Sequence, residues 1–189
     1  MWKNSNEEEE TLRFLCDGML GKIARWLRLL GHDAKYSREI DDEDLIALSA
    51  SEDRILLTRD VELYRKALKL GGKAFLIKGK TRAEKLAELA KKFKLKLDVD
   101  TSLSRCPKCN TQIKHIPKDE ILDRIPEHTR EIYDEFWICP RCGQIYWRGS
   151  HWRKITEILE ESKRLIEIQY EEENLENFNK TGRQKNNFT

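Results

Sequence analysis

Four of the five cysteines form two pairs with the same spacing, and these pairs constrain the second half of the chain more strongly than any other feature. The pairs are Cys106-Pro107-Lys108-Cys109 and Cys139-Pro140-Arg141-Cys142. A Cys-x-x-Cys turn directs two thiolates at one tetrahedral ion, and a second such turn completes a zinc site with no open coordination position. We therefore predict a zinc ribbon in which Cys106, Cys109, Cys139 and Cys142 hold a structural Zn²⁺.

The charge of the chain is unevenly distributed. The formal net charge of all 189 residues is only +2, yet residues 11–156 hold 30 Lys or Arg and 22 Asp or Glu, a net charge of +8. The compensating acidic residues lie in segments 7–10 and 157–176. A basic body is typical of proteins that bind nucleic acid, although a solvated charged surface gives the same composition.

The sequence offers no membrane or export signal. No apolar run reaches the length of a membrane span, and the amino terminus lacks the apolar core of a signal peptide. Paired thiols at zinc spacing, with Cys16 left single, suit a reducing compartment. We expect a cytoplasmic protein in which Cys16 lies in the core, without a membrane partner.

Residues 12–99 alternate short apolar runs with longer helical periods, a pattern that indicates an α/β fold with a mostly parallel sheet flanked by helices. The predicted strands are 12–16, 33–36, 54–58 and 73–77. The predicted helices are 18–30, 42–51, 61–70 and 82–93, the last with Thr81 and Glu84 at capping-box spacing.

The remainder of the chain predicts a small second module. Helical patterning is present at 119–124 and 127–136, a strand is expected at 144–147, and a long helix at 151 to about 170. Beyond residue 171 the polar, Asn-rich composition predicts disorder. The expected boundaries are a disordered acidic terminus (1–11), an α/β domain (12–100), a ribbon with the start of the long helix (101–159), and the rest of that helix with a disordered tail (160–189).

Of three candidate aspartates, at least two stand where an open α/β sheet places ligands. Asp17 follows the first predicted strand, Asp42 opens a helix, and Asp60 follows the third strand. Three carboxylates gathered beyond the strand ends would bind Mg²⁺ or Mn²⁺, which can activate water for attack on a phosphodiester. The structural alternative is that these residues only cap helices. Asp41 and Asp44 are close substitutes for Asp42.

Basic residues lie near these acids in the sequence. Lys22, Arg25 and Arg28 recur at steps of three, one turn beyond Asp17, and form a stripe opposite the apolar side of the first helix. Arg59 precedes Asp60 and is a further candidate phosphate contact. Cations on the outside of a helix also serve solubility alone.

A second candidate RNA contact follows the last cysteine. The segment Trp147-Arg148-Gly149-Ser150-His151-Trp152-Arg153-Lys154 interleaves aromatic rings with cations, a composition able to stack bases and neutralise phosphates. The candidate residues are Trp147, Arg148, His151 and Trp152. The alternative is that both tryptophans join the last helix to the ribbon. Dinucleotide, triphosphate and acyl-transfer motifs are absent from the sequence.

Several of these motifs resemble one family. The run from Phe14-Leu15-Cys16-Asp17-Gly18-Met19-Leu20-Gly21 to Gly31-His32-Asp33 is similar to the opening signature of the PIN-like RNase family named after the carboxyl-terminal domain of the Mut-seven exonuclease. The segment Arg54-Ile55-Leu56-Leu57-Thr58-Arg59-Asp60, the twin Cys-Pro-x-Cys pairs and Tyr146-Trp147-Arg148-Gly149-Ser150-His151-Trp152 resemble its later signatures.

The resemblance, which covers about residues 12–159, implies a PIN-like fold and a metal-dependent RNase. It maps the acidic positions onto Asp17, Asp42 and Asp60. PIN nucleases usually gather about four acidic groups, and the nearest candidate for a fourth here is Asp44. Because PIN-type domains often pair, a homodimer is a further expectation.

The leading hypothesis is therefore a divalent-metal-dependent endoribonuclease in which Asp17, Asp42 and Asp60 hold Mg²⁺ or Mn²⁺ and the zinc ribbon positions RNA. The main alternative is a non-catalytic adaptor that binds RNA, the ribosome or a ribosomal precursor. A toxin-like RNase with a protein antidote is a third hypothesis. The sequence does not distinguish tRNA, rRNA and mRNA as partners.

Overall fold

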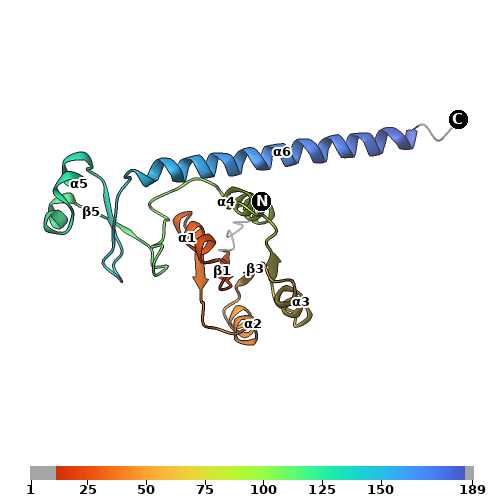
Figure 1. Cartoon of the computed structure of the whole chain (residues 1–189), viewed down its shortest axis with the longest axis horizontal. Helices are drawn as coiled ribbons and strands as arrows, with labels where there is room; N and C mark the ends of the chain where they lie inside the picture. Colours follow the sequence, from red (N-terminus) through yellow and green to blue (C-terminus); the bar gives the residue numbers. More distant parts are fainter. Residues whose placement is uncertain (1–11, 186–189) are drawn as a thin grey trace, which may run out of the picture. The chain divides into compact units, whose positions relative to one another are not determined.

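The computed structural model describes residues 12–185, and the side chains of residues 12–174 (Figure 1). The chain divides into two compact units that interleave along the sequence. One unit runs to Leu76 and adds Val99–Ile116 and Trp137–Ile145. The other contains Ile77–Asp98, Pro117–Phe136 and the chain from Tyr146 onward. The predicted segments 1–11 and 186–189 lie outside the described residues.

A four-stranded sheet organises the first half of the chain. Its strands are β1 (Arg13–Cys16), β2 (Asp33–Tyr36), β3 (Ile55–Thr58) and β4 (Ala74–Leu76), in the order β2-β1-β3-β4. All three pairings are parallel. The helices α1 (Gly21–Leu29), α2 (Asp42–Ser51) and α3 (Val61–Lys69) connect successive strands. The mixed α/β architecture with a parallel sheet is thus confirmed.

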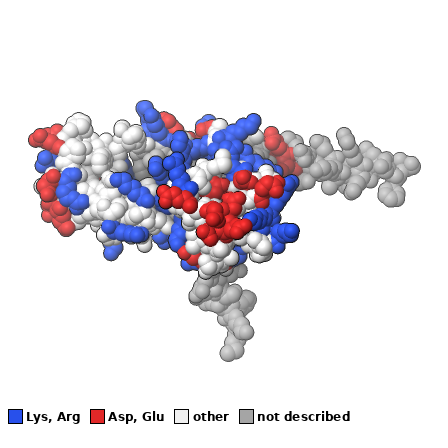
Figure 2. Space-filling model, turned by 60° about the horizontal axis from the view of Figure 1, so that its bottom comes forward, with Lys and Arg blue, Asp and Glu red and all other residues white. Residues whose placement is uncertain are grey.

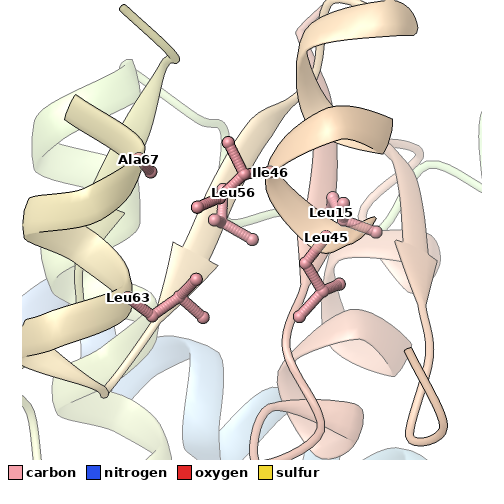
Figure 3. Close-up of a cluster of buried hydrophobic side chains, with 6 residues drawn as sticks. All are labelled: Leu15, Leu45, Ile46, Leu56, Leu63 and Ala67. Carbon is pink, nitrogen blue, oxygen red and sulfur yellow. The ribbon is translucent and has the colours of Figure 1, made fainter. Parts of the chain in front are cut away.

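Two helices cover one face of this sheet. Leu15 of β1 and Leu56 of β3 are register partners, and their side chains pack with residues of α2 and α3 (Figure 3). Each fully buried leucine contributes about 1.5–3 kcal/mol. The helix residues of this buried cluster are Leu45, Ile46, Leu63 and Ala67.

The residues between these positions face the opposite side of the sheet, because side chains alternate along a strand. Phe14 and Cys16 of β1 are fully buried there, and the ring of Phe14 meets that of His32 edge to face. Burial, with the charge of Asp17 acting in the same direction, raises the pKa of the Cys16 thiol to about 12. The prediction that Cys16 belongs to the core is confirmed.

The first helix begins later than expected. The prediction started it at residue 18, but α1 begins at Gly21 because the chain first makes a turn in which the Leu20 N–H donates to the Asp17 carbonyl at 3.0 Å. Helices α2 and α4 (Arg82–Phe93) begin and end as predicted. The capping box of Thr81 and Glu84 at the start of α4 is also confirmed.

The second unit is built around a long helix. Helix α6 (His151–Lys185) contacts α4, and ion pairs join Lys91 to Glu173 at 2.6 Å and Lys163 to Asp98 at 2.8 Å. The helix continues to Lys185, so the expected end near residue 170 is too early. None of the described helices is both long and apolar enough to cross a membrane.

Short elements flank the cysteine pairs. The strands β5 (Lys114–Ile116), β6 (Phe136–Ile138) and β7 (Ile145–Tyr146) form a three-stranded sheet in that order. Between β5 and β6 lie a 3-10 helix, η1 (Lys118–Arg124), and α5 (Glu127–Ile132). Helix α5 is shorter than the predicted 127–136, because Phe136 is fully buried as the first residue of β6.

Candidate active site and metal centre

The three predicted catalytic carboxylates lie along one edge of the parallel sheet. Asp17 directly follows β1, Asp60 stands two residues after β3 ends at Thr58, and Asp42 begins α2 after β2. Strands β1 and β3 are neighbours, and the chain leaves β1 toward β2 on one side and returns through β3 on the other. Such a reversal of strand order is where open α/β sheets bind ligands, beyond the carboxyl ends of the strands.

Asp17 is the anchored member of this group. Its side chain is almost fully buried, with the residue only 5% exposed. Oδ1 accepts the Met19 N–H at 2.9 Å, and Oδ2 accepts the Thr58 hydroxyl and the Arg59 N–H, the latter at 3.3 Å. Donors on both oxygens fix the orientation of the carboxylate.

Asp60 is connected to Asp17 through Thr58. The Thr58 Oγ1 donates to the Asp17 carboxylate and accepts the Asp60 N–H at 2.9 Å. Asp60 also caps α3, because its Oδ1 accepts the N–H groups of Glu62 at 2.7 Å and Leu63 at 3.0 Å. A carboxylate has about four lone-pair sites, so this cap and a bond to a cation are compatible.

Asp42 is the first residue of α2 and follows the end of β2 at Tyr36 by six positions. Asp41, rather than Asp42, caps α2, by accepting the Asp44 N–H at 2.9 Å, and residues 41–44 are all exposed. In Figure 1, α2 and α3 lie at the bottom, the side that Figure 2 turns forward, and Asp and Glu gather there with Lys and Arg around them.

The acidic side chains do not form a closed cage. In the described part of the chain, the four cysteines are the one group of three or more His, Cys, Asp or Glu whose donor atoms all lie within 4.8 Å of one another. Sharing one cation among Asp17, Asp42 and Asp60 therefore requires a change in the position of at least one of these side chains, and Asp42 and Asp60 are both exposed.

The predicted basic stripe on α1 separates into two parts. Lys22 and Arg25 are exposed, as is Arg59 beside Asp60. Arg28, which we expected on the same exposed stripe, is only 7% exposed. Its Nε donates to the Ala34 carbonyl at 2.7 Å and its Nη1 to the Pro107 carbonyl at 2.8 Å. Arg28 therefore has a structural role, because its guanidinium hydrogen-bonds to backbone carbonyls of two different segments.

The aromatic and basic segment after the second cysteine pair is partly committed to internal contacts. The ring of Trp147 lies 6.4 Å from that of Phe136, and the Arg148 guanidinium lies 5.0 Å from the centre of the Trp152 ring. Trp147 nevertheless remains 36% exposed, and His151 is exposed. The packing alternative thus holds for Trp147 in part, and exposed surface remains on the segment.

The cysteine cluster fits a tetrahedral ion. The Sγ atoms of Cys106 and Cys142 lie 3.6 Å apart, and those of Cys109 and Cys139 lie 3.4 Å apart. Ligands on tetrahedral Zn²⁺ stand about 3.8 Å from one another, whereas a disulfide would bring two sulfurs to about 2.05 Å. None of the four cysteines forms a disulfide, and the site could hold Zn²⁺ as a closed structural ligand set.

The two cysteine turns repeat one backbone design. In the first turn the Cys106 N–H donates to the Thr111 carbonyl at 2.8 Å, and in the second the Cys139 N–H donates to the Gln144 carbonyl at 2.9 Å. Each turn has a left-handed residue after its second cysteine, Asn110 at φ 68° and Gly143 at φ 70°. These conformations suit asparagine and glycine, which adopt positive φ most readily.

The environment of the thiols is asymmetric. Burial raises the pKa of the Cys139 thiol to about 12. At Cys109 burial acts in the same direction, but hydrogen bonds with the side chain and backbone of Thr111 outweigh it and lower the pKa to about 6. Zinc binding requires thiolates and releases their protons.

The first cysteine turn is tied to the parallel sheet. Asn110 accepts the Ala34 N–H at 3.2 Å and donates to the Asp33 carboxylate at 2.6 Å, both on β2. The Arg105 N–H donates to the Arg28 carbonyl at 2.7 Å. Together with the hydrogen bonds of Arg28, these contacts connect the first cysteine turn to the sheet. We call the residues that make them the knuckle brace: Arg28, Asp33, Ala34, Arg105, Pro107 and Asn110.

Sequence reasoning missed the residues that connect the site. Thr58 was assigned only as the end of a strand, and Asn110 was not singled out. The sequence carries a signal for Thr58, because this polar residue directly follows the apolar run Ile55-Leu56-Leu57. In the structure Thr58 is fully buried. No comparable signal identifies Asn110, whose partners lie 76 and 77 positions away in the chain.

Comparison with known proteins gave one result. A family model described as the Mut7-C RNAse domain matches residues 12–159. The match spans the sheet, both cysteine pairs and the start of α6. The search of curated proteins and the search of solved structures each found no match.

Proposed function

The chain belongs to the Mut7-C RNAse domain family, and from this premise and the acidic edge of its sheet we propose that it is a divalent-metal-dependent endoribonuclease. Membership suggests an RNase role with RNA as substrate. The proposal goes further, because it names the reaction as hydrolysis of an internal phosphodiester bond and assigns residues to it. The cysteines and the predicted reducing environment favour the cytoplasm as the place of action.

The observation that carries the proposal is the bridge formed by Thr58 between Asp17 and Asp60. The Thr58 hydroxyl donates to the buried carboxylate of Asp17 and accepts the backbone N–H of the exposed Asp60. Asp17 and Asp60 stand after the ends of two adjacent parallel strands. If Asp60 served only to cap α3, the fold would not require Asp17 as a second, buried acid with hydrogen-bond donors on both of its oxygens.

Each acid has a distinct role in this proposal. Asp17 would be the fixed ligand, and Asp60 and Asp42, next to the starts of α3 and α2, would be the other residues that hold the cation. Asp44 is a candidate fourth acid in the first turn of α2. When bound, Mg²⁺ or Mn²⁺ would supply charge stabilisation at the phosphate and lower the pKa of water. Lys22, Arg25 and Arg59 would orient the strand through its phosphates.

The zinc ribbon would contribute further RNA contacts. Lys108 and Arg141, which lie between the cysteines of each pair, are both exposed. The partly exposed rings and cations of 147–152 can stack on bases while they neutralise backbone charge. We assign these residues to RNA positioning and not to the chemical step.

The test is the substitution Asp17→Asn. We expect Mg²⁺- or Mn²⁺-dependent cleavage of a defined RNA to fall by about 100-fold or more, because the change removes a fixed anionic ligand. Because the new amide group meets the Arg59 N–H, the free energy of unfolding should fall by about 1 kcal/mol. Thermal unfolding of both proteins checks that the variant is folded.

Asp123→Asn provides the matched control, since Asp123 is an exposed aspartate of η1 that belongs neither to the parallel sheet nor to the helices that connect its strands. It should cleave like the parent. Unchanged cleavage by purified Asp17→Asn excludes the mechanism. Tight, salt-sensitive RNA binding by the parent, without products in either metal, favours the adaptor instead.

A further inference from the structure

An exposed methionine lies directly beside the buried acid. Met19 is 71% exposed, the largest exposed fraction among the large hydrophobic residues that the structure describes. Its N–H donates to Oδ1 of Asp17 at 2.9 Å, so its backbone is held at the carboxylate. Exposing a side chain of this size to water costs the burial energy that a core position would provide.

The turn that carries Met19 is tightly held. The Leu20 N–H donates to the Asp17 carbonyl at 3.0 Å, and the Tyr36 hydroxyl donates to the Gly18 carbonyl at 3.3 Å. The Tyr36 ring packs against Gly21 so closely that a Cβ at Gly21 would lie 2.6 Å from Cζ of the ring. The exposure of Met19 is therefore a property of a fixed turn.

The charged residues near Met19 in the sequence indicate what kind of ligand would bind there. Lys22 and Arg25 are exposed on the helix that this turn begins, and Arg59 is exposed next to the strand end that donates to Asp17. An exposed apolar side chain that follows a buried acid and precedes a helix with exposed cations matches a ligand with both phosphate charge and a flat apolar surface. A nucleotide of single-stranded RNA has both, because its unstacked base is available for contact.

We propose that Met19 contacts the nucleobase adjacent to the phosphate bound at Asp17, with Tyr36 as the residue that positions its turn. This inference rests on the proposed ribonuclease function and deepens it, because it makes the enzyme selective for unpaired nucleotides. The flexible thioether chain suits any of the four bases, so the contact provides recognition of single strands with little preference for sequence.

The experiment compares Met19→Ala with the parent for binding of a fluorescent single-stranded RNA oligonucleotide, by anisotropy in Ca²⁺ in place of Mg²⁺. The dissociation constant should rise by about 3- to 10-fold, the effect of losing one apolar contact to a base. Met19→Leu should restore most of the affinity. Leu70→Ala is the matched control, because Leu70 is 65% exposed at the end of α3, and it should bind like the parent.

An RNA of the same length that lacks all its bases tests whether Met19 contacts a base. The effect of Met19→Ala should vanish on this abasic RNA. An effect of equal size on the abasic and the normal RNA, or equal affinity of Met19→Ala and the parent for the normal RNA, overturns the proposal.

Cleavage of the same RNAs in Mg²⁺ or Mn²⁺ separates the two proposals. Binding that depends on Met19 without any cleavage supports the base contact and contradicts the ribonuclease function. If Met19→Ala changes neither the binding nor the cleavage of these RNAs, the result contradicts the base contact and leaves the ribonuclease proposal unaffected.

Discussion

At the scale of single residues, one buried arginine organises the start of β2. Arg54 donates to both oxygens of Asp33, at 2.9 and 3.0 Å, and to Oε2 of Glu52 at 2.6 Å. Its Nη1 also lies 3.2 Å from the Phe14 carbonyl on β1. Burying this charge is tolerated because the planar guanidinium is matched by carboxylate and carbonyl acceptors.

This network predicts a pH dependence of stability. Burial acts to raise the pKa of Asp33, but hydrogen bonds from Arg54 and Asn110 and the nearby positive charges hold it below its ordinary value. The stability from this lowered pKa is therefore present above the unfolded pKa of about 4 and is lost as the pH falls through the folded value. Asp33→Asn should cost about 2 kcal/mol at pH 7.

Urea unfolding at pH 7 and pH 3 measures this effect. The difference in unfolding free energy between parent and Asp33→Asn should be clear at pH 7 and shrink at pH 3. Asp53→Asn is the control, because Asp53 pairs with Lys73 at an exposed position, where ion pairs contribute little. A difference of equal size at both pH values would contradict the assignment.

At the scale of elements, α1 shows how one helix carries two different kinds of arginine. Arg25 is exposed, whereas Arg28, one turn later, is buried and bonded to the carbonyls of β2 and the first cysteine turn. The helix thus supplies both a candidate phosphate contact and the central member of the knuckle brace.

We predict different effects for the same substitution at these two positions. Arg28→Met should lower the free energy of unfolding by about 2–4 kcal/mol, because it leaves buried carbonyls without their charged donor. Arg25→Met should change stability by less than about 0.5 kcal/mol, as is usual for an exposed position, and should instead weaken RNA binding. Chemical denaturation and RNA binding of both variants test this difference, and equal stability losses would contradict it.

At the scale of the whole molecule, the cysteine turns belong with the parallel sheet. Val99–Ile116 and Trp137–Ile145, which contain all four cysteines of the cluster, fall in the same compact unit as β1 to β4. This compact unit therefore includes residues on both sides of position 100. Metal binding to the cluster should stabilise the sheet as well as the ribbon, since its free energy is available only when the ligands are folded.

Zinc removal tests this coupling. After chelation, backbone amides of α1 and β2 should exchange hydrogen faster together with those of residues 104–113, because the knuckle brace connects them. Amides of α3 serve as the internal reference. Hydrogen-exchange mass spectrometry of the full chain with and without chelator measures the effect, and increased exchange confined to the cysteine turns would show that the ribbon is independent.

Much of the fold was predictable because its signals are local. The alternation of apolar runs and helical periods gave four strands and four helices with small errors at their ends, and Cys-x-x-Cys spacing alone gave the cluster of Cys106, Cys109, Cys139 and Cys142. The order of elements likewise placed Asp17 and Asp60 at strand ends, where backbone direction puts them on one edge.

The chain by itself thus determined the elements of its first half, its four-cysteine cluster and the edge of the sheet that carries Asp17 and Asp60. Only the tertiary structure decided that Arg28 is buried while Arg25 is exposed, that Thr58 joins Asp17 to Asp60, and that Asn110 binds β2. The physical reason is that the bonds of Thr58 to Asp17, Asn110 to Ala34 and Arg28 to Pro107 join residues 41, 76 and 79 positions apart, and hydrogen bonding between distant segments leaves no periodic trace in the sequence around either partner.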